Sequence, residues 1–265
     1  MNLSGFKKYE TYYINTIKMN IMSLIEYRTD FTTVILGTYG YMLLALFFLN
    51  ILFKNINSLG GWTYYQIMIL FSITQFLYYI FWSFTGGAAG FLTNLINRGE
   101  LDKFLIKPIN TVFSICTNQF ALFTTLPSFL FAFVIFYTGV KNVSIEGSYI
   151  LFIISLIISS VILYLNYFTI SIITFWWEDT GQMHSVFNNL LDLQNYPLEI
   201  YPKLIKPLFV TLIPIAIIAY APFYFLLRGF SLELFAYQIT ALTTFLIIAI
   251  LLWKNGLKNY SSASS

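Results

Sequence analysis

The chain has 265 residues, of which 58% are hydrophobic, 20% are aromatic and 9% are charged. A soluble domain carries about 25% charged residues, and one of this size has too small an interior to bury so much apolar surface. The composition therefore excludes an ordinary soluble protein and predicts one whose apolar side chains face lipid. The net charge of +3 is modest and is better explained by membrane topology than by binding to nucleic acid.

Residues 1–28 are too polar to cross a membrane. Their apolar and tyrosine side chains recur on one helical face, formed by Tyr9, Tyr12, Tyr13, Ile17, Ile21, Leu24 and Ile25. Lys7, Lys8 and Lys18 lie beside this face. The pattern predicts an amphipathic helix at the cytoplasmic membrane surface. A solvated tail is the alternative.

Five apolar runs are long enough to span a bilayer, which requires about 20 residues. These runs are 31–53, 62–85, 112–138, 149–177 and 234–253. No internal repeat or low-complexity linker divides the chain. We therefore expect a single domain over 1–265 with an all-α membrane fold.

The segment between the fourth and the last run permits two arrangements. In the first, 180–207 is a cytoplasmic loop and 208–227 is the fifth span. In the second, 180–200 is a polar fifth span, and 203–228 dips into the outer leaflet as a broken, re-entrant hairpin that protein or water must cover. Both arrangements give six spans with both termini in the cytoplasm, in agreement with the positive-inside rule.

Charge and proline content bear on this choice without deciding it. Lys203 and Lys206 are cytoplasmic in the first arrangement and external in the second, so the charge count alone favours the first. Pro214 and Pro222 interrupt regular helical hydrogen bonding within 208–227. The residues by themselves leave both arrangements open.

The most informative loop is NLINRGELDKFLIKPIN, residues 94–110, between the second and third runs. It mixes charges with large apolar side chains, and Gly99 and Pro108 interrupt it. A solvated connector does not need this apolar content, whereas a short amphipathic helix that docks a partner does. We expect such a helix over 94–107; a helix that merely lies on the bilayer is the alternative. The expected contact residues are Arg98, Glu100, Leu101, Asp102, Phe104, Leu105 and Lys107.

Few residues could carry chemistry. The chain lacks the GxxxxGK[ST] phosphate loop and the common catalytic motifs, so we expect no enzyme activity and no cofactor in this chain. A single cysteine, Cys116, and a single histidine exclude cysteine and histidine metal clusters. Glu178 and Asp179 are expected to cap the following helix. Polar residues within spans are costly, and they either line a pathway or join helices. The candidates for a pathway are Asn118, Asn166, His184, Asn188, Asn189, Asp192 and Gln194.

Several segments share their order and spacing with one protein family. The strongest is RGELDKFLIKPIN at 98–110. The weaker ones are EYRTDF at 26–31, FWWED at 175–179, YPLEIYP at 196–202, IPIAIIAYAPFYFLLRG at 213–229 and GLKNYSSAS at 256–264. Together they cover nearly the whole chain, which resembles the ABC-2 type permeases of bacterial transporters.

The resemblance implies a type V exporter-like fold. Residues 1–28 would be an interfacial connecting helix and 94–107 a coupling helix. The fifth span would lie at 180–200, followed by outer-side re-entrant helices at 203–228.

The resemblance also implies partners. These are a second permease, identical or homologous, and two copies of an ABC ATPase subunit that holds ATP and Mg²⁺. The expected location is the bacterial cytoplasmic (inner) membrane, and the expected function is export of an amphiphilic or hydrophobic solute by alternating access. A secondary transporter or channel without an ATPase is the alternative. Such proteins usually carry ionisable groups in the membrane, for which only Asp192 is a candidate here.

Overall fold

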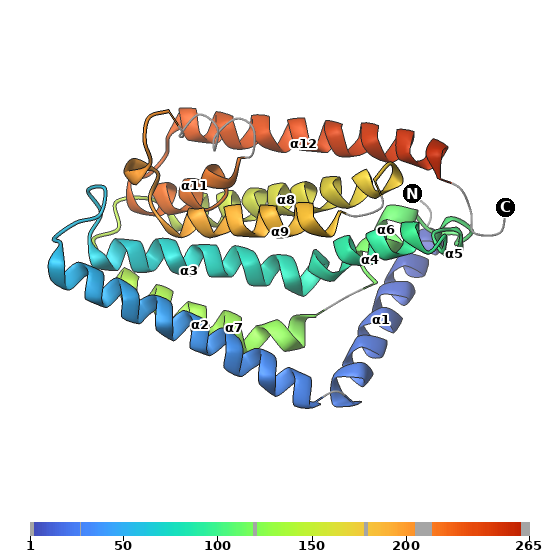
Figure 1. Ribbon diagram of the computed structural model, residues 1–265, viewed down its shortest axis with the longest axis horizontal. Helices are drawn as coiled ribbons and strands as arrows, with labels where there is room; N and C mark the ends of the chain where they lie inside the picture. The colour runs from blue at the N-terminus through green and yellow to red at the C-terminus, as the bar shows by residue number, and fades with distance from the viewer. Residues whose placement is uncertain (1–2, 27, 119–120, 178–179, 205–213, 261–265) are drawn as a thin grey trace.

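The body of the molecule is a bundle of long helices. The computed structural model describes residues 3–26, 28–118, 121–177, 180–204 and 214–260. The five long helices that run side by side (Figure 1) are α2 (Arg28–Asn55), α3 (Tyr64–Phe81), α7 (Leu122–Lys141), α8 (Tyr149–Ile172) and α12 (Leu232–Asn259). Helix α1 (Leu3–Glu26) begins, and α12 ends, at the same end of this bundle. The short helices α5 and α6 also lie there, and we name it the elbow end; the opposite end is the far end.

Five helices are long and apolar enough to cross a membrane, and they fall on the five apolar runs of the sequence. They are Thr32–Asn55, Tyr64–Phe84, Thr124–Lys141, Tyr149–Phe175 and Leu232–Asn259. Large apolar side chains on α2 and α12, such as Leu44 and Ile247, are exposed on the outside of the bundle, where lipid would cover them. The prediction of an all-α, multi-pass membrane protein is therefore confirmed.

The third predicted run differs from one continuous helix. Residues 112–138 are divided between α6 (Thr111–Cys116) and α7. The second run, in contrast, continues beyond its predicted end through a π-helix (Trp82–Gly86) into α4 (Gly87–Asn97). The two changes are linked, because the Ala121 amide donates to the Ser83 carbonyl of the π-helix at 2.9 Å instead of continuing a helix from α6.

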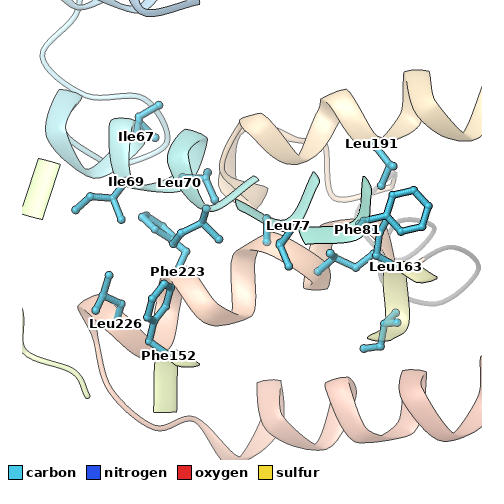
Figure 2. Close-up of a cluster of buried hydrophobic side chains, with 14 of the residues drawn as sticks. Ile67, Ile69, Leu70, Leu77, Phe81, Phe152, Leu163, Leu191, Phe223 and Leu226 are labelled. Atoms are coloured by element: carbon cyan, nitrogen blue, oxygen red, sulfur yellow. The ribbon is translucent and has the colours of Figure 1, made fainter. Parts of the chain in front are cut away.

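The core lies where α3 and α8 meet the shorter helices. Helix α11 (Ile215–Leu227) packs across α8 and α3 at the far end, and Pro222 lies inside it. Figure 2 shows the side chains that meet there: Ile67, Ile69, Leu70, Leu77 and Phe81 of α3, Phe152 and Leu163 of α8, Leu191 of α9, and Phe223 and Leu226 of α11. Burial of these large apolar side chains makes α3 the central element of the fold.

The disputed segment 180–228 contains several short elements. Helix α9 (Gly181–Leu191) lies lengthwise beside α8 and continues into a 3₁₀ turn, Asp192–Asn195. A further turn, Leu198–Ile200, reaches the loop at Gly60 at the far end. The chain from 181 to 200 therefore runs along the bundle towards the far end. Lys206 and Glu178–Asp179 are outside the described residues.

A backbone strap ties α11 to the loop before α8. The amides of Gly147 and Ser148 donate to the carbonyls of Leu226 and Phe225, both at 3.1 Å. A Cβ atom at Gly147 would overlap the carbonyl oxygens of Phe225 and Leu226. Only glycine allows this approach of the two backbones.

We expect Gly147→Ala to lower the thermal unfolding temperature of the purified protein, because forced repacking of this kind costs about 1–3 kcal/mol. The matched control is Gly90→Ala in α4, where an added Cβ meets nothing within 4 Å. That change should leave the unfolding temperature unchanged or raise it, since alanine is the better helix former. Equal unfolding temperatures for the two variants would contradict the strap.

Candidate functional site

The loop between α4 and α6 forms a compact bend, which we name the elbow (residues 98–109). Helix α4 ends at Asn97, and the chain reverses at Gly99, whose φ of 64° suits glycine. One helical turn, α5 (Asp102–Leu105), follows. The Asn110 side chain then caps α6 by accepting a hydrogen bond from the Phe113 amide at 3.0 Å. The predicted helix over 94–107 is thus the end of α4, a glycine turn and one separate turn.

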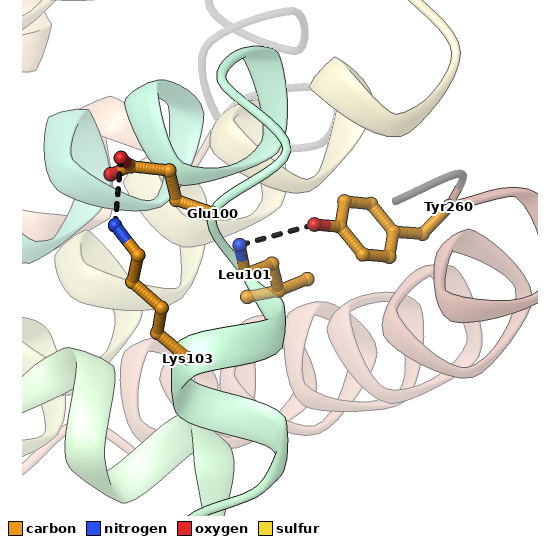
Figure 3. A network of polar contacts seen from close by, with 4 residues as sticks. All are labelled: Glu100, Leu101, Lys103 and Tyr260. Atoms are coloured by element: carbon orange, nitrogen blue, oxygen red, sulfur yellow. Dashed lines mark hydrogen bonds and ion pairs between the residues drawn. The ribbon is translucent and has the colours of Figure 1, made fainter. Parts of the chain in front are cut away.

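Two of the predicted contact residues hold the elbow to its own bundle. Leu101 is 0% exposed and Phe104 is 7% exposed, and both pack among side chains of α4 and α6. The Phe104 ring meets Phe91 edge to face, with centroids 5.4 Å apart. The Leu101 amide donates to the Tyr260 hydroxyl at 3.1 Å (Figure 3). These side chains are covered by this chain and do not form the outer surface of the elbow.

The outer surface of the elbow carries both an apolar tip and charges. Leu105 is 39% exposed and Ile106 is 82% exposed. Ile106 was not among the predicted contact residues, although its position beside Leu105 in an apolar stretch was a signal for it. Such exposed apolar side chains on a polar surface are typical of a docking site.

The charged residues surround this tip. Lys103 and Glu100 form an ion pair at 2.8 Å (Figure 3). The hydrogen bond and charge of Lys103 hold the pKa of Glu100 below its ordinary value. The Lys107 ammonium lies 3.8 Å from the centroid of the Phe104 ring, and Arg98 is exposed. Exposed ion pairs contribute little to stability, so these charges are better suited to orienting a partner.

Helix α1 clamps the other side of the elbow. The Asn110 amide donates to the Tyr9 hydroxyl at 3.1 Å, and the Tyr9 ring meets Phe113 at 5.0 Å. The Tyr12 hydroxyl donates to the Ser114 carbonyl at 3.3 Å. The tyrosine face that the sequence predicts for residues 1–28 therefore contacts α6 and the elbow. Ile14, Met19 and Met22 are exposed on α1.

A polar cavity of about 370 Å³ lies between α2, α3 and α9. Four predicted pathway residues line it together: Asn188, Asn189, Asp192 and Gln194. The side chains opposite were not predicted as lining residues; they are Thr38 and Tyr41 of α2 and Thr74, Gln75, Tyr78 and Tyr79 of α3. The sequence spacing of Thr74, Gln75, Tyr78 and Tyr79 could have predicted this lining, because it places the four side chains on one face of a helix.

Hydrogen bonds fix part of this lining. The Thr74 hydroxyl donates to the Asn195 side-chain oxygen at 2.5 Å, which joins α3 to the turn after α9. The Tyr167 hydroxyl of α8 donates to the Asn188 side-chain oxygen. The Gln194 side chain is 9% exposed, and its buried Oε1 accepts no hydrogen bond from the described residues. This oxygen is covered by the protein, so a solute in the cavity does not reach it.

The other three predicted pathway residues do not line this cavity. Asn166 is buried within α8, where its side chain donates to the Ile162 carbonyl at 2.8 Å. The His184 ring stacks on Tyr167, and its Nε2 lies 3.1 Å from the Ser171 hydroxyl. The Asn118 carbonyl accepts from Asn20 of α1 at 3.4 Å. Within the described part of the chain, no group of three or more metal-ligating side chains could hold an ion.

A second cavity of about 260 Å³ shares Thr38, Tyr78 and Tyr79 with the first. It reaches Trp82 in the π-helix and Thr125 of α7. Polar and aromatic lining thus follows α3 from the first cavity towards the elbow end.

A bundle of long apolar helices with a polar cavity between them is typical of a membrane transport protein. Residues 39–264 match the model of the ABC-2 family transporter proteins, and the chain belongs to this family. It is therefore the permease part of an ABC transporter, a subunit that is typically non-catalytic. No curated protein and no solved structure matches the chain.

We expect Tyr260→Phe to loosen the elbow. The change removes the acceptor of the buried Leu101 amide, and an unsatisfied buried group costs about 1–3 kcal/mol. Hydrogen–deuterium exchange of a peptide covering 98–109 should then speed up by roughly tenfold or more.

The control is Tyr237→Phe on the same helix, where the ring is exposed. Its exchange over 98–109 should equal that of the unmodified protein. Unchanged elbow exchange in Tyr260→Phe would show that this hydrogen bond does not hold the elbow.

Proposed function

We propose that the chain is the membrane-spanning half of an ABC exporter, with the elbow as its coupling helix. The main support is that Leu101 and Phe104 pack the elbow against the bundle, whereas Leu105 and Ile106 are exposed on its outer surface. A part that transmits force needs this combination of a rigid attachment and an outward contact. Two copies of a separate ATPase subunit dock below, and they hold the ATP and Mg²⁺ that supply the energy.

The proposed topology has six spans. The segment 180–200 is the fifth, 203–228 is the re-entrant region, and both termini lie in the cytoplasm of a bacterial inner membrane. This is supported by the cations at the elbow end, among them Arg98 and Lys103, which suit the cytoplasmic side. At the far end, the Arg228 guanidinium lies 4.3 Å from the Trp62 ring centroid, where the ring stabilises its charge, so this cation is compatible with an external far end.

A second permease, identical or homologous, is proposed to cover α9. Asn188 and Asn189 on this helix are exposed, and so is Asp192 directly after it. Lipid cannot satisfy these groups, so a protein or a water-filled path must face them. The transport pathway then lies at the contact between the two permeases, with the polar cavity on its wall.

The proposed mechanism is alternating access. When the motors close, the elbow moves with them, because its apolar tip is seated in a motor subunit. The packing of Leu101 and Phe104 passes this displacement to α4 and, through the π-helix, to α3. Because α3 lines the cavity, a movement of α3 changes the side of the membrane to which the cavity opens. The cargo is an amphiphilic or hydrophobic solute, in keeping with the tyrosines of the cavity.

One observation favours the alternative of a secondary transporter or channel. Asp192 is an ionisable side chain in the polar cavity, and such groups couple ion flow in secondary transporters. Liposomes that contain only the purified chain separate the two functions. Solute transport there without nucleotide or companion protein would support the alternative and overturn the exporter.

We expect Ile106→Asp to weaken co-purification of an ATPase with a phosphate loop and to abolish transport-coupled ATP hydrolysis. Loss of a central apolar contact in an interface costs about 2 kcal/mol or more, which is roughly 30-fold in affinity. Because Ile106 packs little against its own chain, the thermal unfolding temperature of the isolated permease should not change.

The matched control is Leu204→Asp at the far end, where the side chain is 92% exposed. It introduces the same charge at an equally exposed apolar position, and it should leave ATPase binding intact. Equal co-purification of the two variants, or full coupling in Ile106→Asp, would refute the elbow as the coupling site.

A further inference from the structure

Among the described residues, the only charged side chain that lines the polar cavity is acidic. Asp192 contributes a carboxylate, and no lysine, arginine or histidine lines the cavity. In the described part of the chain, no cation forms an ion pair with Asp192. A carboxylate within a membrane protein is costly unless an opposite charge or water compensates it. The missing opposite charge is a property that a solute can supply.

The opposite wall suits the same kind of solute. Tyr41, Tyr78 and Tyr79 bring three phenol rings to the cavity from α2 and α3. The faces of such rings attract ammonium groups, and their edges pack against apolar groups. Neither property favours an anion.

We propose that the cavity binds an amphiphilic organic cation, such as a protonated amine on an apolar body. The ammonium lies against Asp192, and the apolar body lies among the tyrosines. This assignment rests on the proposed function, because it names the solute class of the exporter.

The test uses three probes of one shape and different charge. They are 4-phenylbutylamine, which is cationic at pH 7, 4-phenylbutanol, which is neutral, and 4-phenylbutyrate, which is anionic. Equilibrium binding is measured on the full-length chain in nanodiscs of neutral lipid. We expect the amine to bind at least about tenfold more tightly than the other two, which corresponds to about 1.4 kcal/mol. Equal affinity for the three probes would overturn the proposal.

Variants then locate the bound charge. Asp192→Asn should lower the affinity for the amine to that for the alcohol and leave the alcohol unaffected, whereas Asp192→Glu should retain most of the preference. Glu146→Gln, the same chemical change in the exposed loop before α8, is the matched control and should bind like the unmodified chain. Unaltered amine binding in Asp192→Asn would sink the assignment, provided that the variant unfolds at the temperature of the unmodified chain.

The cation assignment and the exporter function are tested independently, because the binding assay contains no ATPase or nucleotide. Asp192-dependent amine binding by a chain that never associates with an ATPase would overturn only the exporter function. ATPase coupling that depends on Ile106, without any preference for the amine, would overturn only the cation assignment.

Discussion

Hydrocarbon offers no hydrogen bonds, and this constraint decides which polar groups of the molecule are structural and which are available for function. Gln238 on α12 shows the structural solution: its amide nitrogen donates to the Ser159 hydroxyl at 2.9 Å, and its oxygen accepts from Ser155 at 3.0 Å. Both ends of that side chain are used, and α8 and α12 are joined. Gln194 has the same chemistry and similar burial, but its oxygen has no partner in the described chain. The contrast separates a side chain that joins two helices from one whose oxygen joins none.

The apolar side chains of the elbow also fall into two groups, one buried within the chain and one exposed. Leu101 and Phe104 are used within the chain, while Leu105 and Ile106, one and two residues further on, are turned outward. The short stretch 101–106 therefore provides both the attachment and the contact surface. Helix α1 reinforces the attachment through its tyrosines, so the connecting segment, the elbow and the C-terminal Tyr260 form one assembly at the elbow end. A displacement applied there reaches the bundle through packed side chains and not through a flexible loop.

The sequence predicts the spans well because each one is a long apolar run, and the five long helices fall on those runs. It fails where a distant group decides the outcome. The break before α7 depends on the Ser83 carbonyl, which no pattern around residue 121 reveals. Leu101 and Phe104 looked like partner contacts because an apolar residue in a polar loop fits a foreign groove and its own core equally well. The cavity tyrosines were missed for the opposite reason, since tyrosine in an apolar run does not interrupt it.

The π-helix at Trp82–Gly86 has a mechanical consequence. A π-turn holds one more residue than an α-turn, and each residue of an α-helix advances the chain by about 100° around the axis. If this turn tightened to regular α-geometry, everything after it would rotate by roughly that angle, α4 and the elbow included. Ser83 would at the same time have to release the Ala121 amide that starts α7. A register change in these five residues would thus rotate α4 and the elbow relative to α3 and its cavity wall.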